Sequence, residues 1–345
     1  MPPVIENTPE GLYCAAGDFH IDPWRPVARA VTTHAHSDHA RPGSRSYLCA
    51  EVGRRVLAAR VGQAATIEIL SYGERRRFGD ATVSLHPAGH ILGSAQVRVE
   101  VGGEVWVVSG DYNNTADDST CAPFEPVRCH TFITESTFGL PIYRWPDPTG
   151  VFAAIQRWWA QNQAEGITSA IAAYPLGKSQ RLLASLDPAQ GPIAVHGSVA
   201  TFLPLYAEAG VRLAPAQRFA ELDLKAFKGQ GLLIVSASAQ EARAFDRLQP
   251  LSWAFASGWM MTRAARRNRS FDRGFVLSDH ADWPGLVQAI AATGAERIGV
   301  THGPAEIFAR WLREQGREAF PLATRFTGET AGAEEDGSGT ENSEP

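Results

Sequence analysis

A segment from Thr33 to Ala40 contains four side chains that commonly bind metal ions, at the spacing H-x-H-x-D-H: His34, His36, Asp38 and His39. Imidazole and carboxylate groups together suit zinc, manganese or iron, and they suit an alkali ion poorly. Random placement rarely brings four such residues within six positions. This segment therefore predicts a metal site.

The residues around this segment indicate how it is positioned. Residues 27–32 are typical of a short buried strand, and residues 50–57 have helical spacing. Ligands on a loop that leaves a strand can converge on one point, whereas ligands along a strand would point to both faces.

Further candidate ligands follow other expected strands, at 65–70, 81–86, 96–101 and 104–108. His90 lies in a glycine-flanked turn, and Asp111 comes just after an apolar segment. A site with two metals needs a carboxylate able to bridge them, and Asp111 is the best candidate. Asp22 ends a pair of strands expected within 11–23 and is a candidate to orient a ligand histidine, although a turn-forming Asp before Pro is an alternative.

Three later apolar segments also end in chemically active side chains. Residues 132–139 contain Glu135, residues 275–283 contain His280, and residues 298–304 contain His302. Their repeated position after expected strands favours one convergent site.

The middle of the chain has a different pattern. Prolines at 141, 146 and 148 indicate a linker. Helices are then expected at 151–163, 179–186 and 199–209, alternating with strands at 169–174, 193–196 and 232–236. This alternation is typical of a small α/β domain with a parallel sheet.

Two basic features lie in this region. Lys178 follows glycine as in a phosphate loop, but position 172 is alanine where that loop needs glycine, which excludes nucleotide hydrolysis. Lys178 at a helix N-terminus is a candidate to hold a backbone phosphate, and a solvated lysine is the alternative. Clustered arginines favour contact with a polyanion over a merely solvated face: Arg263, Arg266, Arg267, Arg269 and Arg273.

Composition is that of an ordinary globular protein, with 44% hydrophobic and 20% charged residues. The net charge is −5, and it is unevenly distributed. Residues 327–345 contain six acidic residues and no basic ones, and the remainder of the chain holds 32 basic and 31 acidic side chains. That last segment is expected to be disordered. We find no apolar run of membrane-spanning length, no secretory signal and no C-x-x-C pair, so we expect a cytoplasmic protein with reduced cysteines.

The metal segment, together with the later T-E-S-T-F-G, S-D-H-A-D and T-H-G-P segments, resembles the metallo-β-lactamase superfamily and, within it, the β-CASP nucleases. The pattern is most similar to bacterial DNA-ligase-associated exonucleases, and more distantly to Artemis-type and mRNA 3′-end-processing nucleases. This resemblance implies an α/β fold, an αββα metallo-β-lactamase sandwich with an inserted small β-CASP domain. The implied division is 1–145 and 271–326 for the sandwich, 146–270 for the insertion and 327–345 for the acidic tail.

The resemblance also implies roles for individual residues. His34, His36 and His90 would bind one divalent metal ion, and Asp38, His39 and His302 the other, with Asp111 bridging and Asp22 in support. Zinc is expected, with manganese as the alternative. The metals would generate hydroxide from water for in-line attack on phosphorus. His280 would act as general acid, which is worth about 10²–10⁴-fold in rate, and Glu135 would orient it. Asp38 is expected to be a catalytic residue as well as a metal ligand.

The implied function is a DNA exonuclease in DNA repair, with nucleic acid, and by resemblance a DNA ligase or other repair proteins, as partners. His302 brings the site closer to the RNA-processing branch, so an RNA-processing endo- or exonuclease is an alternative. A small-molecule hydrolase of the lactamase or thioesterase type is a further alternative, although it explains neither Glu135 nor His280.

Overall fold

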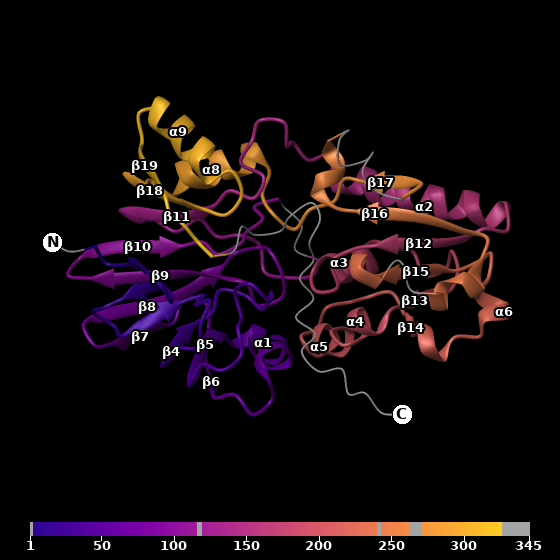
Figure 1. Cartoon of the computed structure of the whole chain (residues 1–345), viewed down its shortest axis with the longest axis horizontal. Coiled ribbons are helices and arrows are strands. Elements are labelled where there is room, and N and C mark those ends of the chain that lie inside the picture. The colour runs from indigo at the N-terminus through magenta and orange to yellow at the C-terminus, as the bar shows by residue number, and fades with distance from the viewer. Residues whose placement is uncertain (1–2, 116–118, 240–242, 263–270, 326–345) are drawn as a thin grey trace.

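The computed structural model describes residues 3–115, 119–239, 243–262 and 271–325, whose strands form three sheets (Figure 1). The first sheet follows chain order: β1 (Glu6–Thr8), β2 (Gly11–Cys14), β3 (Phe19–Ile21), β4 (Arg29–Val31), β5 (Ser46–Ala50) and β6 (Ile67–Leu70). β1, β2 and β3 pair antiparallel, and the remaining neighbours pair parallel.

The second sheet has the order β19-β18-β11-β10-β9-β8-β7. Its strands are β7 (Arg75–Phe78), β8 (Ala81–Pro87), β9 (Ala95–Val101), β10 (Glu104–Val108), β11 (Thr131–Glu135), β18 (Arg297–Thr301) and β19 (Glu318–Pro321). Two antiparallel steps lead from β8 through β9 to β10, and β10, β11 and β18 pair parallel. β8, β10, β11 and β18 therefore run in one direction, and their carboxyl ends meet at one edge of the sheet.

The two sheets pack face to face through one buried apolar cluster, which joins Leu12 and Leu48 of the first sheet to Val83 and Val97 of the second. The helices α8 (Trp283–Thr293) and α9 (Ala305–Glu314) cover the other face of the second sheet, and α1 (Arg54–Val61) covers the other face of the first. Because side chains alternate along a strand, each sheet can supply both its faces with apolar groups.

The third sheet, called the parallel sheet below, has the order β14-β13-β15-β12-β16-β17. Its strands are β12 (Thr168–Ala172), β13 (Ile193–Val195), β14 (Gln217–Arg218), β15 (Leu232–Val235), β16 (Leu251–Ala256) and β17 (Arg273–Phe275), all paired parallel. Its helices are α2 (Pro148–Ala164), α3 (Lys178–Ser185), α4 (Gly197–Ala200), α5 (Leu203–Glu208) and α6 (Leu224–Phe227). Parallel strands covered on both faces are buried throughout, as β12 and β15 are.

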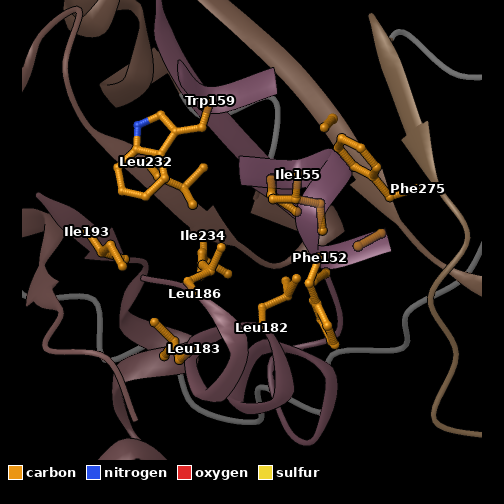
Figure 2. Close-up of a cluster of buried hydrophobic side chains, with 14 of the residues drawn as sticks. Phe152, Ile155, Trp159, Leu182, Leu183, Leu186, Ile193, Leu232, Ile234 and Phe275 are labelled. Atoms are coloured by element: carbon orange, nitrogen blue, oxygen red, sulfur yellow. The ribbon is translucent and has the colours of Figure 1, made fainter. Parts of the chain in front are cut away.

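The core of the parallel sheet is built largely by α2 and α3. Ile155 and Trp159 of α2 lie over Leu232 and Ile234, and Leu182 of α3 belongs to the same cluster (Figure 2). In Figure 1 the parallel sheet lies beside the two packed sheets, with α3 at the junction between them.

One expected helix differs in the structure. The helix expected at 199–209 is divided into α4 and α5, because Pro204 in the first turn of α5 lacks the N–H needed to continue a helix. The parallel sheet extends to Phe275, because β17 pairs with β16. The acidic segment 327–345 lies outside the described residues, and no described helix is both long and apolar enough to cross a membrane.

Ile155 provides a test of this core. It is fully buried, so Ile155→Ala is expected to lower the free energy of unfolding by about 2–5 kcal/mol, through lost burial and the cavity left behind. Ile307 on α9 is 59% exposed, so Ile307→Ala is expected to change that free energy by less than about 0.5 kcal/mol. Urea unfolding followed by circular dichroism measures both values, and equal losses would contradict the burial of α2.

Candidate metal centre

The predicted ligands converge at the carboxyl edge of the second sheet. His90, Asp111 and His302 follow β8, β10 and β18, and Glu135 ends β11. Within the described residues, ligand atoms lie within 4.8 Å of one another in each of three groups: His34, His36, His90 and Asp111; His39, Asp111 and His302; Asp111, Glu135 and His280. These histidine and aspartate clusters could hold metal ions.

Two of the histidines have protons fixed by backbone carbonyls. His36 Nε2 lies 3.0 Å from the Leu176 carbonyl oxygen, and His90 Nδ1 lies 2.8 Å from that of Asp279. Since a carbonyl oxygen only accepts, both nitrogens must carry the proton. The remaining nitrogens, His36 Nδ1 and His90 Nε2, lie 3.1 Å apart with facing lone pairs in the neutral rings. An arrangement of this kind favours a cation bound to both.

Asp22 fixes the other two histidines of the H-x-H-x-D-H segment. Its carboxylate accepts the Nδ1 proton of His39 at 2.7 Å and the hydroxyl proton of Thr33 at 2.5 Å. The Thr33 oxygen, 3.1 Å from His34 Nδ1, is then left to accept from that ring. Asp22 thus orients His39 directly and His34 through Thr33, which leaves Nε2 of both rings available to a metal.

Asp111 lies at the centre of the cluster. Its Oδ2 is 3.4 Å from His39 Nε2 and 3.6 Å from His34 Nε2, while its Oδ1 is 3.3 Å from His302 Nδ1. Burial alone would raise the pKa of Asp111, but the imidazoles of His39, His280 and His302 hold it well below its usual value. The carboxylate is therefore ionised and can contact both metal-binding groups.

The histidines differ in their protonation. Burial, followed by neighbouring imidazoles, lowers the pKa of His34, His36 and His90, so these rings are neutral, as metal ligands must be. Burial also acts against a charged His39, but the carboxylates around it, Asp111 first, raise its pKa well above the usual value. The same negative charge would favour a metal ion at His39 Nε2.

The unsatisfied atoms of the cluster also fit a metal. Four buried atoms have no hydrogen-bond partner among the described residues: His34 Nε2, His39 Nε2, Asp111 Oδ1 and His302 Nδ1. Buried polar atoms are rarely left in this state without an ion or water, because desolvation without a bond is costly. Histidine and aspartate donors of this kind suit a divalent cation.

Asp22, which orients a ligand, and His302, a candidate ligand, have unusual backbones. Asp22 has φ of 44° and His302 has φ of 56°, in the left-handed region that non-glycine residues seldom adopt. Strain of this kind persists only where surrounding contacts hold it.

Glu135 and His280 form a buried pair beside the histidines. His280 Nδ1 lies 2.9 and 3.0 Å from the two carboxylate oxygens, and Glu135 also accepts from the backbone N–H of Tyr112 at 2.9 Å. The rings of His280 and His90 have centroids 4.7 Å apart. The carboxylate thus holds the Nδ1 proton of His280.

The other predicted residues are placed differently. Asp38 Oδ2 is 3.6 Å from His39 Nε2, at the margin of the cluster with 23% of its side chain exposed. Lys178 is only 2% exposed and faces Asp279, because the N-terminus of α3 is packed inside the protein. Contact with a nucleic-acid backbone would require an accessible side chain. Four predicted nucleic-acid-binding residues lie outside the described residues: Arg263, Arg266, Arg267 and Arg269.

Sequence reasoning missed three contributors. Thr33 is adjacent to the ligands, and its hydroxyl could have been noticed for that reason. Leu176 and Asp279 act through backbone carbonyls, for which the residue type carries no signal.

No protein-family model matches the chain. The chain is 31% identical over 314 residues to a probable DNA ligase from Opitutus terrae, a match that covers 90% of this chain and 30% of that protein. It is 29% identical over 123 residues to cleavage and polyadenylation specificity factor 73 from Drosophila melanogaster, covering 35% of this chain and 18% of that protein. With endoribonuclease ysh-1 from Neurospora crassa it shares 28% over 132 residues, which is 38% of this chain and 15% of that protein.

The chain spans less than a third of the length of each of these relatives. A solved structure of a protein of unknown function from Enterococcus faecalis is similar in fold, with a TM-score of 0.57 and 14% identity over 87% of this chain and 80% of that one. Together with the histidine and aspartate clusters at the sheet edge, the similarities to these relatives are consistent with the resemblance of the chain to the β-CASP nucleases of the metallo-β-lactamase fold.

Proposed function

We propose that this protein is a metal-dependent nuclease that hydrolyses phosphodiester bonds, and specifically a DNA exonuclease in DNA repair. The observation that carries this proposal is the buried His280–Glu135 pair next to Asp111 and the metal-binding groups. A lactamase or thioesterase site would need the metals but not this additional acid–base pair. We also propose that the two packed sheets with α1, α8 and α9 form the αββα sandwich of the fold and that the parallel sheet forms the inserted β-CASP domain.

The donors fit two divalent ions, with zinc favoured by the five imidazoles of the first two groups and manganese as the alternative. One ion would be held by His34, His36 and His90, and the other by His39 and His302 with Asp38 at the margin, Asp111 being shared. When bound, such ions lower the pKa of water towards neutrality and offset negative charge on phosphate oxygens. Asp22 and the carbonyls of Leu176 and Asp279 would hold the rings in the required orientation.

His280 is proposed as the general acid. Glu135 accepts the Nδ1 proton, which stabilises the charged form of the ring and directs Nε2 away from the carboxylate. From the imidazolium, the Nε2 proton would pass to the oxygen of the leaving sugar as its bond to phosphorus breaks. His280 would then regain a proton from solvent.

DNA is favoured because the similarity to the probable DNA ligase extends over most of this chain. RNA is the second candidate, since the shorter matches are to a cleavage and polyadenylation factor and an endoribonuclease. A DNA ligase or another repair protein is the proposed partner.

Replacing His280 tests the general-acid role. His280→Ala is expected to lower the rate of phosphodiester cleavage by about 10²–10⁴-fold while both metal ions are retained. Cleavage rates and metal content by mass spectrometry measure the two effects. His86→Ala is the matched control and should leave the rate unchanged, because His86 lies 3.3 Å from Glu125 and belongs to none of the three metal-binding groups. Loss of metal from His280→Ala would assign His280 to the ligands and overturn this role.

Removal of the metals should affect both activity and stability. After treatment with a chelator, cleavage is expected to stop and the melting temperature to fall, because the facing lone pairs and buried carboxylate lose their counter-charge. Zinc at 100 times its dissociation constant should restore about 2.7 kcal/mol of stability. Scanning calorimetry with and without zinc measures the change, and cleavage that persists in metal-free protein would exclude the proposed chemistry.

The substrate is tested with 5′-labelled single- and double-stranded DNA and RNA, each with zinc or manganese. DNA degraded to mononucleotides is the expected result. Cleavage of RNA alone would select the RNA-processing alternative. Turnover of nitrocefin or S-lactoylglutathione without cleavage of either nucleic acid would select the small-molecule hydrolase.

A further inference from the structure

The loop between β12 and α3 lies directly on the metal centre. Its Leu176 carbonyl accepts the Nε2 proton of His36, and the ring of Tyr174 lies 4.6 Å from that of His36, centroid to centroid. Gly177 has φ of 100°, and a Cβ at this position would overlap Ile91, so a close approach is built into the backbone. The parallel sheet therefore contributes to a ligand carried by the first two sheets.

The segment between β17 and α8 makes the corresponding contact with His90. There the Asp279 carbonyl accepts the Nδ1 proton of that ring at 2.8 Å, and Asn113 donates to the neighbouring Ser278 carbonyl at 3.2 Å. The two carbonyls, Leu176 and Asp279, thus determine which nitrogens of His36 and His90 face each other.

A buried set of charges joins these two segments. Lys178 Nζ lies 4.0 Å from Asp279 Oδ2, and Arg181 Nη1 lies 3.7 Å from Asp279 Oδ1 and donates to the Ser278 carbonyl at 2.6 Å. Lys178, Arg181 and Asp279 are 2%, 7% and 3% exposed. Charges this deeply buried are tolerated only when they are paired, so separation of the segments would be costly.

We propose that Lys178, Arg181 and Asp279 form a buried latch that positions His36 and His90, so that docking of the parallel sheet and metal affinity at these two ligands are coupled. The proposal rests on the proposed function only in requiring that metal binds here. His39 and His302 are not held by these carbonyls, and His39 is oriented by Asp22 of the β3–β4 connection. The latch residues are positioning residues, since the ring nitrogens rather than the latch would contact the metal.

The variant Lys178→Met tests the latch in the full chain. Arg181 continues to balance the charge of Asp279, so the variant should fold, which circular dichroism checks. Zinc affinity is measured on metal-free protein, without substrate, by competition with a chromophoric chelator. One ion is expected to bind about 10–100-fold more weakly, the usual effect of losing support behind a ligand, and the other is expected to be unchanged.

His302→Ala identifies which ion is affected. This variant should lose the ion held by His39 and His302, and adding Lys178→Met should then weaken the ion that remains. Lys178→Arg, which keeps the charge, should restore affinity. Lys225→Met, an exposed lysine of α6, is the matched control and should bind zinc as the unchanged chain does. Coupling to docking is read by hydrogen exchange, which should quicken in residues 173–181 and 278–281 when zinc is removed.

Unchanged zinc affinity in Lys178→Met, equal loss at both ions, or exchange that does not respond to zinc would each overturn the latch. Unchanged affinity with a raised KM for nucleic acid would instead assign Lys178 to the substrate. Failure of the proposed function is a separate result: a chain that binds two zinc ions and shows the latch effects, yet cleaves no nucleic acid, would refute only the nuclease activity.

Discussion

The structure depends on the orientation of imidazole rings around one buried carboxylate. The rings around Asp111 are oriented by the protons on their outer nitrogens, which protein groups accept. Asp22, Thr33 and two backbone carbonyls accept those protons. The result is a concentration of lone pairs and negative charge that a divalent ion can compensate, and the surrounding strands and loops are arranged to maintain it.

The parallel direction of β8, β10, β11 and β18 explains why residues far apart in the chain meet. Each strand delivers one functional side chain to the same edge of the second sheet, while the first sheet adds the H-x-H-x-D-H loop from β4. The parallel sheet completes the centre by a backbone contact rather than by a ligand side chain. Both layered parts of the molecule are therefore needed for the observed ring orientations.

Features that depend on residue type or on local sequence pattern could be predicted, whereas features that depend on contacts between distant residues could not. Metal-binding side chains after apolar segments were recognisable by residue type, and the alternation of strands and helices indicated the parallel sheet. The burial of Lys178 was not predictable, because it depends on Asp279, which is distant in sequence and packs there only in the fold. Pro204 did signal the break between α4 and α5, but the apolar periodicity across it outweighed that signal.

The left-handed backbones of Asp22 and His302 have a consequence for protein engineering. At both positions glycine would relieve the backbone, and strain of this kind is worth about 1–3 kcal/mol. Each such exchange would delete a group that orients or binds a ligand. At these two sites the relief of backbone strain is therefore opposed by the loss of hydrogen bonds or of metal binding, both of which stabilise the fold.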